Sequence, residues 1–274
     1  MALGHFGEWM QGGLGSDLAL VTVVCPPMAV YARRLADGPL RLSGPGARAV
    51  PLDRAVRLAH ALDVAPQTAG HIVLTGAAPP GGGAGASTAG LVALARIWLA
   101  QSHPPKTNQE ALPARIARAC LLAEGASDPV MYPSPDHLLW APRTGRVLAP
   151  LPAPLPAVTV LGGFWGQGQV TDVADTRFPD IAPLWADVRR GPLCPARLAG
   201  LATQSARACT DLRGPQNDPT DGLARDLGAL GYLRAHTGSA RGMIFAPGAA
   251  PVHGVAALTE AGLTGVFSFA TGGT

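Results

Sequence analysis

The feature that most constrains this chain is a glycine-rich segment, residues 79–90, that joins a strand-like run to a helix-like run. The run His71–Thr75 before it reads as a strand, and the apolar run after it, residues 87–100, is long enough for a helix. Glycines let a backbone approach an anion closely, and a helix N-terminus adds free amides and a dipole. The segment therefore predicts a phosphate-binding loop, with an ordinary flexible turn before a capped helix as the alternative.

Two hydroxyl side chains follow the glycines directly. Ser87 and Thr88 fall in the first turn of the predicted helix, where a hydroxyl can cap the helix or reach a metal bound to phosphates. No Gly-Lys-Ser/Thr sequence follows the glycines, so the segment is not a Walker A loop.

Length and composition indicate a folded globular protein. The 274 residues allow one large domain or two smaller ones, and 47% of them are hydrophobic while 14% are charged. Apolar runs such as residues 18–24 are much shorter than a membrane span, and no basic leader with an apolar core opens the chain. We therefore expect a soluble cytoplasmic protein without a membrane partner.

The distribution of charge argues against a nucleic-acid partner. Lys106 is the single lysine among 21 basic residues, and the arginines are scattered along the chain. Nucleic-acid-binding proteins usually cluster their cations in a stripe or patch. The four cysteines are widely spaced and form no CxxC pair, so we expect neither a disulfide nor a structural metal.

The first half of the chain predicts mixed strands and helices. The run Cys25-Pro26-Pro27 is expected to interrupt one extended region, since prolines break strands. In this half we expect strands at 18–24, 29–33, 71–75 and 137–141, and helices at 52–62, 87–100 and 111–122.

A proline-rich stretch, residues 150–156, is expected to be a linker or a stiff crossover. We place a domain boundary there, with an N-terminal domain at 1–152 and a C-terminal domain at 153–274. The second half predicts strands at 157–161, 242–245 and 265–270, and helices at 181–189, 196–212, 222–230 and 252–261. This mixture indicates an α+β or α/β fold.

Three further segments carry polar residues in loop-like settings. Residues 4–12 contain Glu8, one of only four glutamates in the chain; residues 123–129 contain Asp128 in a Ser-Asp-Pro run. Residues 236–242 carry a Gly-Ser pair and Arg241, whose guanidinium suits an oxyanion. Taken singly, each segment also reads as an ordinary turn: a β-turn with solvated side chains, a Ser-Asp-Pro turn and a strand-entry turn.

Together the four segments resemble the GHMP kinases. Residues 84–89, Ala-Gly-Ala-Ser-Thr-Ala, stand where that family has Leu-Gly-Ser-Ser-Ala-Ala, and Ala86 replaces the first serine of the motif. The segment Gly-Glu-x-x-Gln-Gly at residues 7–12 resembles one branch, the L-threonine kinases of cobalamin biosynthesis. Residues 123–129 and 236–242 resemble the Glu-Pro-Ser/Thr-Asp and His-Ser-Gly-Ser-x-x-Gly elements of the same branch. The segments occur in family order and span residues 4–242.

The resemblance implies roles for individual residues. Asp128 matches the catalytic aspartate, and Ser87 matches the serine that binds Mg²⁺. Gly125 stands at the family's glutamate position, and Glu124, one residue earlier, is the candidate second metal ligand. The implied ATP-binding residues are Pro80, Gly81, Gly82, Gly83, Ala84, Gly85, Ala86, Ser87 and Thr88. The implied substrate-binding residues are Glu8, Gln11, Gly12, His236, Gly238 and Ser239.

The resemblance also implies a fold and a reaction. The expected fold is α+β with two domains, the C-terminal one ferredoxin-like, and with ATP and substrate meeting in the cleft between them. The expected reaction uses ATP and Mg²⁺ to convert L-threonine to O-phospho-L-threonine, by a monomer or a homodimer. Two alternatives stay open: a kinase of another small alcohol such as homoserine, and a non-catalytic binding protein that keeps the fold.

Overall fold

The computed structural model describes residues 1–76, 78–101, 111–168, 172 and 174–272. Within these residues the strands are β1 (Ala2–Leu14), β2 (Asp17–Ala36), β3 (Arg41–Ser43), β4 (His71–Thr75), β5 (Leu138–Ala141), β6 (Arg146–Pro150), β7 (Val158–Phe164), β8 (Gly231–Arg234), β9 (Ala240–Phe245) and β10 (Thr264–Thr271). The α-helices are α1 (Leu52–Ala61), α2 (Ala86–Gln101), α3 (Leu112–Glu124), α4 (Ala182–Val188), α5 (Pro195–Arg213), α6 (Thr220–Asp226) and α7 (Gly254–Glu260). Two short 3₁₀ helices, η1 (Pro45–Ala49) and η2 (Pro135–His137), complete the set.

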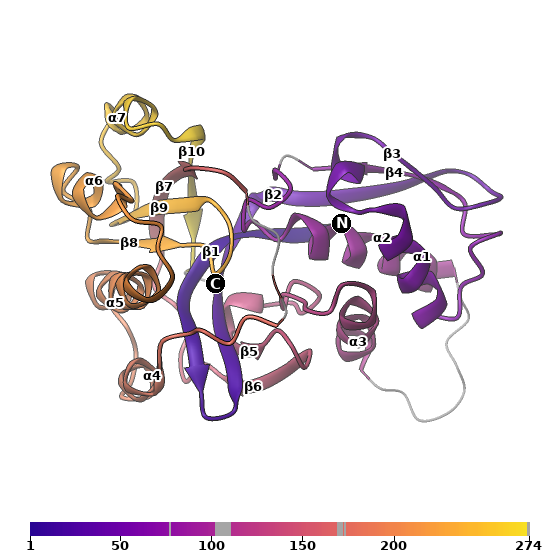
Figure 1. Cartoon of the computed structure of the whole chain (residues 1–274), viewed down its shortest axis with the longest axis horizontal. Helices are drawn as coiled ribbons and strands as arrows, with labels where there is room; N and C mark the ends of the chain where they lie inside the picture. Colours follow the sequence, from indigo (N-terminus) through magenta and orange to yellow (C-terminus); the bar gives the residue numbers. More distant parts are fainter. Residues whose placement is uncertain (77, 102–110, 169–171, 173, 273–274) are drawn as a thin grey trace.

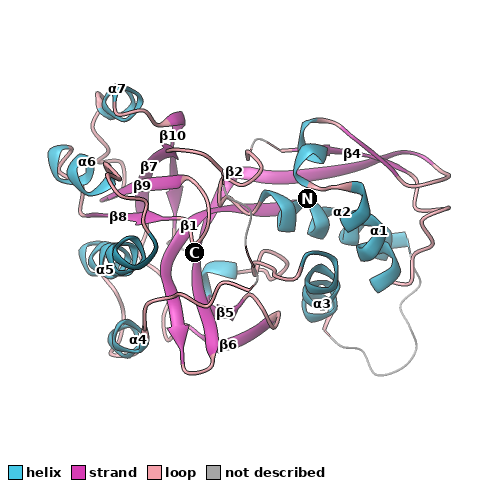
Figure 2. Ribbon diagram, in the orientation of Figure 1, coloured by secondary structure: helices cyan, strands magenta, loops and turns pink. Residues whose placement is uncertain are grey.

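One sheet runs through both ends of the molecule. Its strand order is β10-β7-β9-β8-β1-β2-β4-β3, and β5 branches from β2 to pair with β6. All strand pairs are antiparallel except β3 with β4. The long β1–β2 hairpin lies at the centre, with α1, α2 and α3 at one end and α4, α5, α6 and α7 at the other (Figures 1 and 2). The fold is α+β, as predicted.

The buried apolar side chains of the described residues form three clusters. One lies among α1, α2, α3 and β4, and another lies among α6, α7, β9 and the loops beside them. The cluster between them contains side chains of β1 and β2 together with side chains of β7, β9 and α5. Within it Phe6 makes edge-to-face contacts with Phe164, Phe267 and Phe269. Ala2 of β1 and Val30 of β2 belong to the cluster around α1, α2 and α3. The first two strands therefore contribute to the core at both ends of the molecule.

The prediction that residues 4–12 form a loop is wrong, because they lie in β1. This strand is buried along almost its whole length, so it lacks the alternation of polar and apolar residues that marks a half-exposed strand. Its glycines permit close packing: a Cβ on Gly4 would lie 2.2 Å from the carbonyl oxygen of Met28, and one on Gly12 would lie 2.2 Å from that of Pro179. Glycines that resemble a loop in sequence here serve close backbone approach.

The expected strand break at Pro26-Pro27 is also wrong, because β2 continues from Asp17 to Ala36. The pairing of β1 with β2 shifts register between Gly4↔Cys25 and Ala2↔Val30, so both prolines lie in an irregularity of the ladder. Both are exposed. A proline cannot donate to a strand ladder, and at such a bulge no donor is required.

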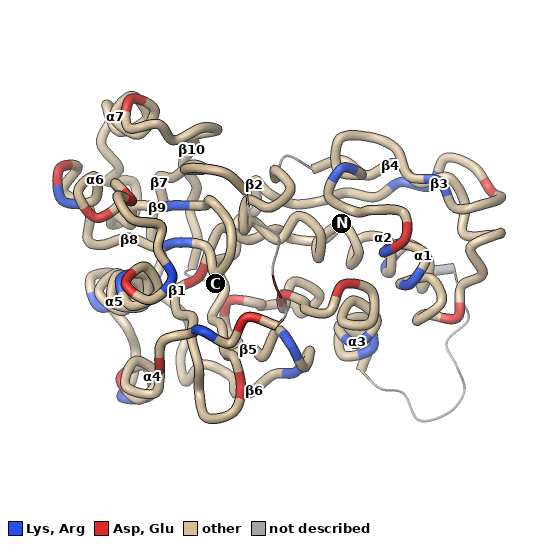
Figure 3. The backbone as a smooth tube through the Cα atoms, viewed as in Figure 1, with Lys and Arg blue, Asp and Glu red and all other residues tan. Residues whose placement is uncertain are grey.

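The longer predicted elements are confirmed within a few residues of their ends, and β4 agrees at both ends. Strands β3, β6 and β8, which have three, five and four residues, are not among the predicted elements. Residues 222–230 were assigned wholly to a helix, whereas α6 ends at Asp226. No helix among the described residues is long and apolar enough to cross a membrane. Basic and acidic positions are interspersed at both ends of the molecule (Figure 3).

Candidate active site

A cavity of about 260 Å³ lies where the glycine-rich loop meets β1, the end of α3 and the turn between β8 and β9. The whole predicted phosphate loop, from Pro80 to Thr88, lines it. Glu8, Glu124, Asp128 and His236 line it as well. The structure thus brings residues from all four sequence segments to one cavity.

The glycine-rich loop is held between β1 and the β8–β9 turn. The carbonyl of Gly82 accepts hydrogen bonds from the backbone N–H groups of Ser239 and Ala240, at 3.1 and 2.8 Å. On the other side, the N–H groups of His5 and Gly7 donate to the carbonyls of Ala84 and Gly83, both at 3.3 Å. Segments far apart in the sequence therefore fix the position of the loop.

Two glycines of the loop have no room for a side chain. Gly83 has a φ of 73°, and a Cβ there would lie 2.3 Å from the carbonyl oxygen of Thr237. Gly85 has a φ of 63°, and its Cβ would lie 2.2 Å from the ring of His5. Residues with side chains rarely adopt such φ values, so both position and conformation require glycine here.

The loop leads directly into α2, whose first turn contacts the last residue of α3. The hydroxyl of Ser87 donates to Oε2 of Glu124 at 2.5 Å, and that of Thr88 donates to Oε1 at 2.7 Å. The sequence prediction paired Ser87 with Glu124, and the structure places the two in contact. Gly125 follows in the left-handed conformation with φ 80° and ends α3.

Arg54, near the start of α1, completes this group. Its Nη1 donates to Oγ of Ser87 at 3.1 Å and lies 3.3 Å from Oε2 of Glu124. Burial raises the pKa of Glu124 to about 7, although the hydrogen bonds from Ser87 and Thr88 and the charge of Arg54 oppose the rise. A hydroxyl oxygen next to a carboxylate is a donor set that suits Mg²⁺, so these residues fit the metal that the resemblance implies.

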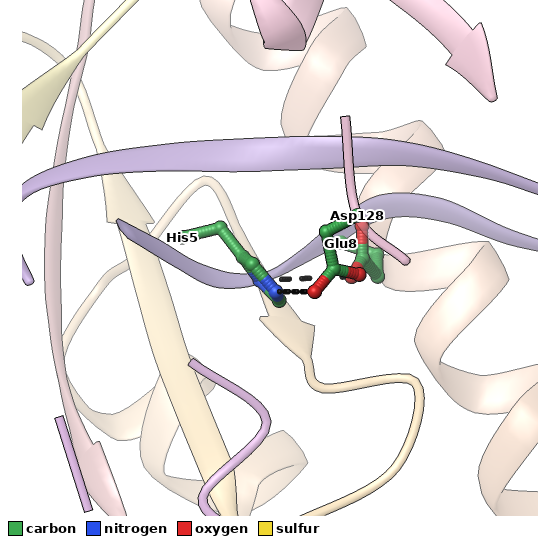
Figure 4. Close-up of side chains that lie close together, drawn as sticks. All are labelled: His5, Glu8 and Asp128. Atoms are coloured by element: carbon green, nitrogen blue, oxygen red, sulfur yellow. Dashed lines mark ion pairs between the residues drawn. The ribbon is translucent and has the colours of Figure 1, made fainter. Parts of the chain in front are cut away.

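A second charged group lies deeper in the cavity. Nε2 of His5 lies 3.0 Å from Oδ2 of Asp128, and Nδ1 of His5 lies 3.8 Å from Oε1 of Glu8 (Figure 4). The side chains of His5 and Glu8 are buried, and that of Asp128 is 22% exposed. One imidazole thus lies between two carboxylates.

The protonation states in this second group follow from that arrangement. Burial alone would lower the pKa of His5, but the charge and hydrogen bond of Asp128, with the charge of Glu8, raise it to about 9. Burial alone would raise the pKa of Asp128, but His5 and then Thr88 hold it below its ordinary value. Burial raises the pKa of Glu8 to about 8. At neutral pH His5 is therefore an imidazolium and Asp128 a carboxylate.

The ligand atoms of His5, Glu8 and Asp128 lie within 4.8 Å of one another, close enough for a metal ion. In this structure Nε2 of His5 and Oδ2 of Asp128 lie 3.0 Å apart and form an ion pair.

Some predicted substrate residues do not line the cavity. Nε2 of Gln11 donates to the carbonyl of Arg234 at 3.1 Å, and Oε1 of Gln11 faces the thiol of Cys209. Gly12 packs against Pro179. Gly238 and Ser239 contact the outer side of the glycine-rich loop. Gly238 and Ser239 therefore help to fix the loop, whereas Gln11 and Gly12 take part in the packing of β1.

Arg241, expected to meet a phosphate, is also away from the cavity. It is buried, and its Nε donates to Oδ2 of Asp218 at 2.6 Å while Nη1 donates to the carbonyls of Gly238 and Ala240. The ion pair with Asp218 satisfies the buried charge. Arg241 therefore fixes the β8–β9 turn.

His236, one of the predicted substrate-binding residues, lines the cavity, and aromatic and basic groups surround it. Its ring stacks on Phe178 with centroids 4.7 Å apart, and the guanidinium of Arg213 lies 4.4 Å from the centre of the Phe178 ring. Burial, followed by the charge of Arg213, lowers the pKa of His236 to about 3. His236 is therefore a neutral group at physiological pH.

Sequence reasoning missed His5, Arg54 and Arg143, all of which line the cavity. His5 lay inside a segment already singled out, three residues before Glu8, and a strand assignment for that segment would have drawn attention to it. Arg54 lies on the polar face of the amphipathic run 52–62, where an exposed arginine is ordinary. Nothing in the sequence distinguishes it from its neighbours.

No protein-family model matches the chain, and no curated protein sequence matches it. Solved structures do match over nearly its whole length. Mevalonate kinase of L. major in complex with R-mevalonate is 13% identical, with a TM-score of 0.63 over 98% of this chain and 93% of that one. Homoserine kinase from Cytophaga hutchinsonii is 19% identical, with a TM-score of 0.58 over 100% and 94%.

A third structure, 4-(cytidine 5'-diphospho)-2C-methyl-D-erythritol kinase, is 20% identical, with a TM-score of 0.51 over 99% of this chain and 98% of that one. At such low identity, similarity of structure establishes the fold and leaves the reaction to be argued from the site. The chain has the fold of these small-molecule kinases, the GHMP kinase fold that its motifs predicted.

Proposed function

We propose that this chain is an ATP-dependent phosphotransferase that phosphorylates the hydroxyl group of a small alcohol. One observation carries the proposal: a glycine-rich loop at a helix N-terminus and the ion pair of His5 with Asp128 line the same cavity. The first is a site for phosphates and the second is a site for an acceptor hydroxyl. Phosphoryl transfer requires both within one enclosed space.

The phosphate end supplies backbone amides and a metal site. Residues 81–88, which include the N-terminus of α2, line the cavity, and free amides at a helix N-terminus favour negative charge. Ser87 and Glu124 would hold Mg²⁺, which when bound neutralises charge on the phosphate oxygens. Glu124 lies next to the position at which related motifs have glutamate, yet it reaches Ser87 directly. This contact favours a working site over a non-catalytic binding protein.

The acceptor end supplies an ionised carboxylate. Asp128 can accept a hydrogen bond from the acceptor hydroxyl, orient its oxygen and take its proton as the new bond forms. His5 keeps Asp128 ionised and fixes its position. The low pKa makes Asp128 a weak base, which suffices when the transition state is loose and catalysis is mainly positioning.

L-threonine is the acceptor that we favour. The support is the set of motifs that resemble those of L-threonine kinases, together with Glu8, a buried side chain on the cavity wall whose carboxyl oxygens can accept hydrogen bonds from the ammonium group of an amino acid. L-homoserine carries the same ammonium group and a primary hydroxyl, so it is the nearest rival. The product from L-threonine is O-phospho-L-threonine.

The experiment is an assay of ADP release from ATP and Mg²⁺ with L-threonine, L-serine, L-homoserine or no acceptor. We expect L-threonine to stimulate ADP release well above the other three conditions. Stimulation by another acceptor alone would retain the kinase and reject the threonine assignment. ADP release that no acceptor stimulates would count against a kinase of hydroxy amino acids.

A further inference from the structure

Arg54 contacts the two residues that would hold the metal, although no sequence motif includes it. It extends from the first turn of α1, and its Nη1 lies 3.1 Å from Oγ of Ser87 and 3.3 Å from Oε2 of Glu124. Those two oxygens are themselves 2.5 Å apart. One guanidinium nitrogen thus bridges the hydroxyl and the carboxylate.

The bridge has a clear electrostatic reason. The side chain of Glu124 is 7% exposed, and a buried carboxylate without a cationic partner is costly. Among the ion pairs of the described residues, Arg54 is the cation that pairs with Glu124. In the absence of a metal, the arginine therefore supplies the positive charge that this carboxylate needs.

The same geometry leaves Arg54 able to move. Its side chain is 27% exposed and lines the cavity, whereas Glu124 is enclosed. A guanidinium carries five N–H donors, and the contacts to Ser87 and Glu124 use Nη1 alone. A divalent cation on the same two oxygens would repel the guanidinium, whose donors match phosphate oxygens well.

We propose that Arg54 is an exchangeable cation of the Ser87–Glu124 pair, which it holds in the metal-free protein and leaves for the nucleotide phosphates when a divalent cation binds. The inference rests on the proposed function, since it assumes that phosphates enter this cavity. It makes Arg54 a residue that couples nucleotide binding to metal binding. Because Arg54 reaches the phosphates only when a divalent cation holds Ser87 and Glu124, metal-bound nucleotide should depend on Arg54 more strongly than metal-free nucleotide does.

Arg57 offers a matched control, one helical turn along the same helix. Its Nη1 pairs with Asp53 at 2.9 Å and its Nε donates to the carbonyl of Ala123 at 2.9 Å. Arg57 therefore ties α1 to α3 as Arg54 does. Its hydrogen bonds and ion pairs with the described residues include neither Ser87 nor Glu124. A change at Arg57 tests for general loosening of the helix pair.

The experiment measures binding of β,γ-imido-ATP by calorimetry, once with EDTA and once with Mg²⁺, to the wild type, R54Q, R54K and R57Q. The quantity of interest is the factor by which Mg²⁺ tightens binding. We expect R54Q to weaken binding with Mg²⁺ roughly tenfold, by about 1.4 kcal/mol, and to lose much less with EDTA, because the phosphate contact of Arg54 forms only with the metal. The factor should therefore fall in R54Q, stay at the wild-type value in R57Q and return toward it in R54K.

Several results would overturn the inference. An unchanged factor in R54Q, or equal changes in R54Q and R57Q, would show that Arg54 has only a structural role. If the wild type binds the analogue but the factor is unchanged in R54Q, this inference fails and the kinase proposal stands. A wild type that binds no analogue under either condition would reject the kinase proposal and this inference together.

Discussion

Two of the carboxyl groups that line the cavity, those of Glu124 and Asp128, have pKa values shifted in opposite directions. Glu124 at the end of α3 receives hydrogen bonds from two hydroxyls and one half-exposed arginine, and its pKa rises to about 7. Asp128, four residues later, faces an enclosed imidazolium, and its pKa falls below the ordinary value. Burial acts in the same direction on both groups, so the partner decides the outcome.

The difference assigns separate tasks to the two residues. A carboxyl group whose pKa is close to 7 can exchange its proton for a metal at physiological pH, because a metal ligand must be deprotonated. A carboxylate paired with an imidazolium stays ionised over a wide pH range and is available to a hydroxyl. Pairs of titratable groups whose surroundings separate their pKa values often mark distinct chemical roles.

The largest effect is expected from Asp128→Asn. The substitution keeps the shape of the side chain but removes its charge and its capacity to take a proton, so turnover should fall roughly a hundredfold or more. Affinity for β,γ-imido-ATP should change little, because the phosphate end is intact. The matched control is Asp226→Asn on the exposed side of α6. Near-wild-type turnover of the Asp128 variant would contradict the assigned role.

Glu124→Gln should have the next largest effect. Loss of a metal ligand should raise the Mg²⁺ concentration for half-maximal turnover roughly tenfold or more. In the wild type, Mg²⁺ affinity should increase as pH rises from 6 to 8, because Glu124 loses its proton in that window. The variant should lack this increase. A pH-dependence that survives in the variant would place the titrating group elsewhere.

Gly85→Ala should reduce stability to a smaller extent. The left-handed backbone costs about 1–2 kcal/mol with a side chain present, and the added Cβ also meets the His5 ring. Chemical denaturation should show the loss, and nucleotide affinity should fall because the loop must shift. Gly222→Ala in α6 is the control, since no atom lies within 4 Å of its added Cβ. Equal stabilities of the two variants would contradict the packing described here.

The last prediction concerns the dependence of stability on pH. The pKa of His5 is about 9 in the folded protein and near 6.5 when unfolded, so its contribution is full below 6.5 and is lost as pH rises through 9. Burial raises the pKa of Glu8 from 4.5 to about 8 in the folded protein, so the folded protein also loses stability as pH rises from 4.5 through 8. The free energy of unfolding should therefore fall by roughly 1–3 kcal/mol between pH 6.5 and 9. His5→Gln should flatten this slope, and an equally steep slope in that variant would refute the assignment.

The glycine-rich loop could be singled out from the sequence because its signal is local. Glycines, hydroxyls and a helix start occur within one short segment, residues 79–90, and the structure places its residues 80–88 along the cavity. That the loop binds phosphate stays a prediction. The class α+β and most longer elements followed from periodicity in the same way. The domain boundary at residue 152 stays a prediction, since β1 and β2 contribute to the core at both ends of the molecule.

The parts that could not be predicted depend on contacts between distant segments. Residues 4–12 look like a loop in sequence because they are rich in glycine. In the structure these glycines permit close packing around a buried strand. His5 meets Asp128, and Arg54 meets Ser87 and Glu124, only after the chain has folded. Arg241 looked suitable for a phosphate until its partner Asp218 was known. Charge pairing across the fold, rather than local pattern, decides these roles.

The most direct test of the central claim is to follow the γ-phosphate itself. ATP with a labelled γ-phosphate, Mg²⁺ and L-threonine are incubated with the wild type and with Asp128→Asn, and the amino acid is analysed by mass spectrometry. We predict labelled O-phospho-L-threonine from the wild type and far less from the variant. Label recovered only as inorganic phosphate, or equal product from both proteins, would contradict the account.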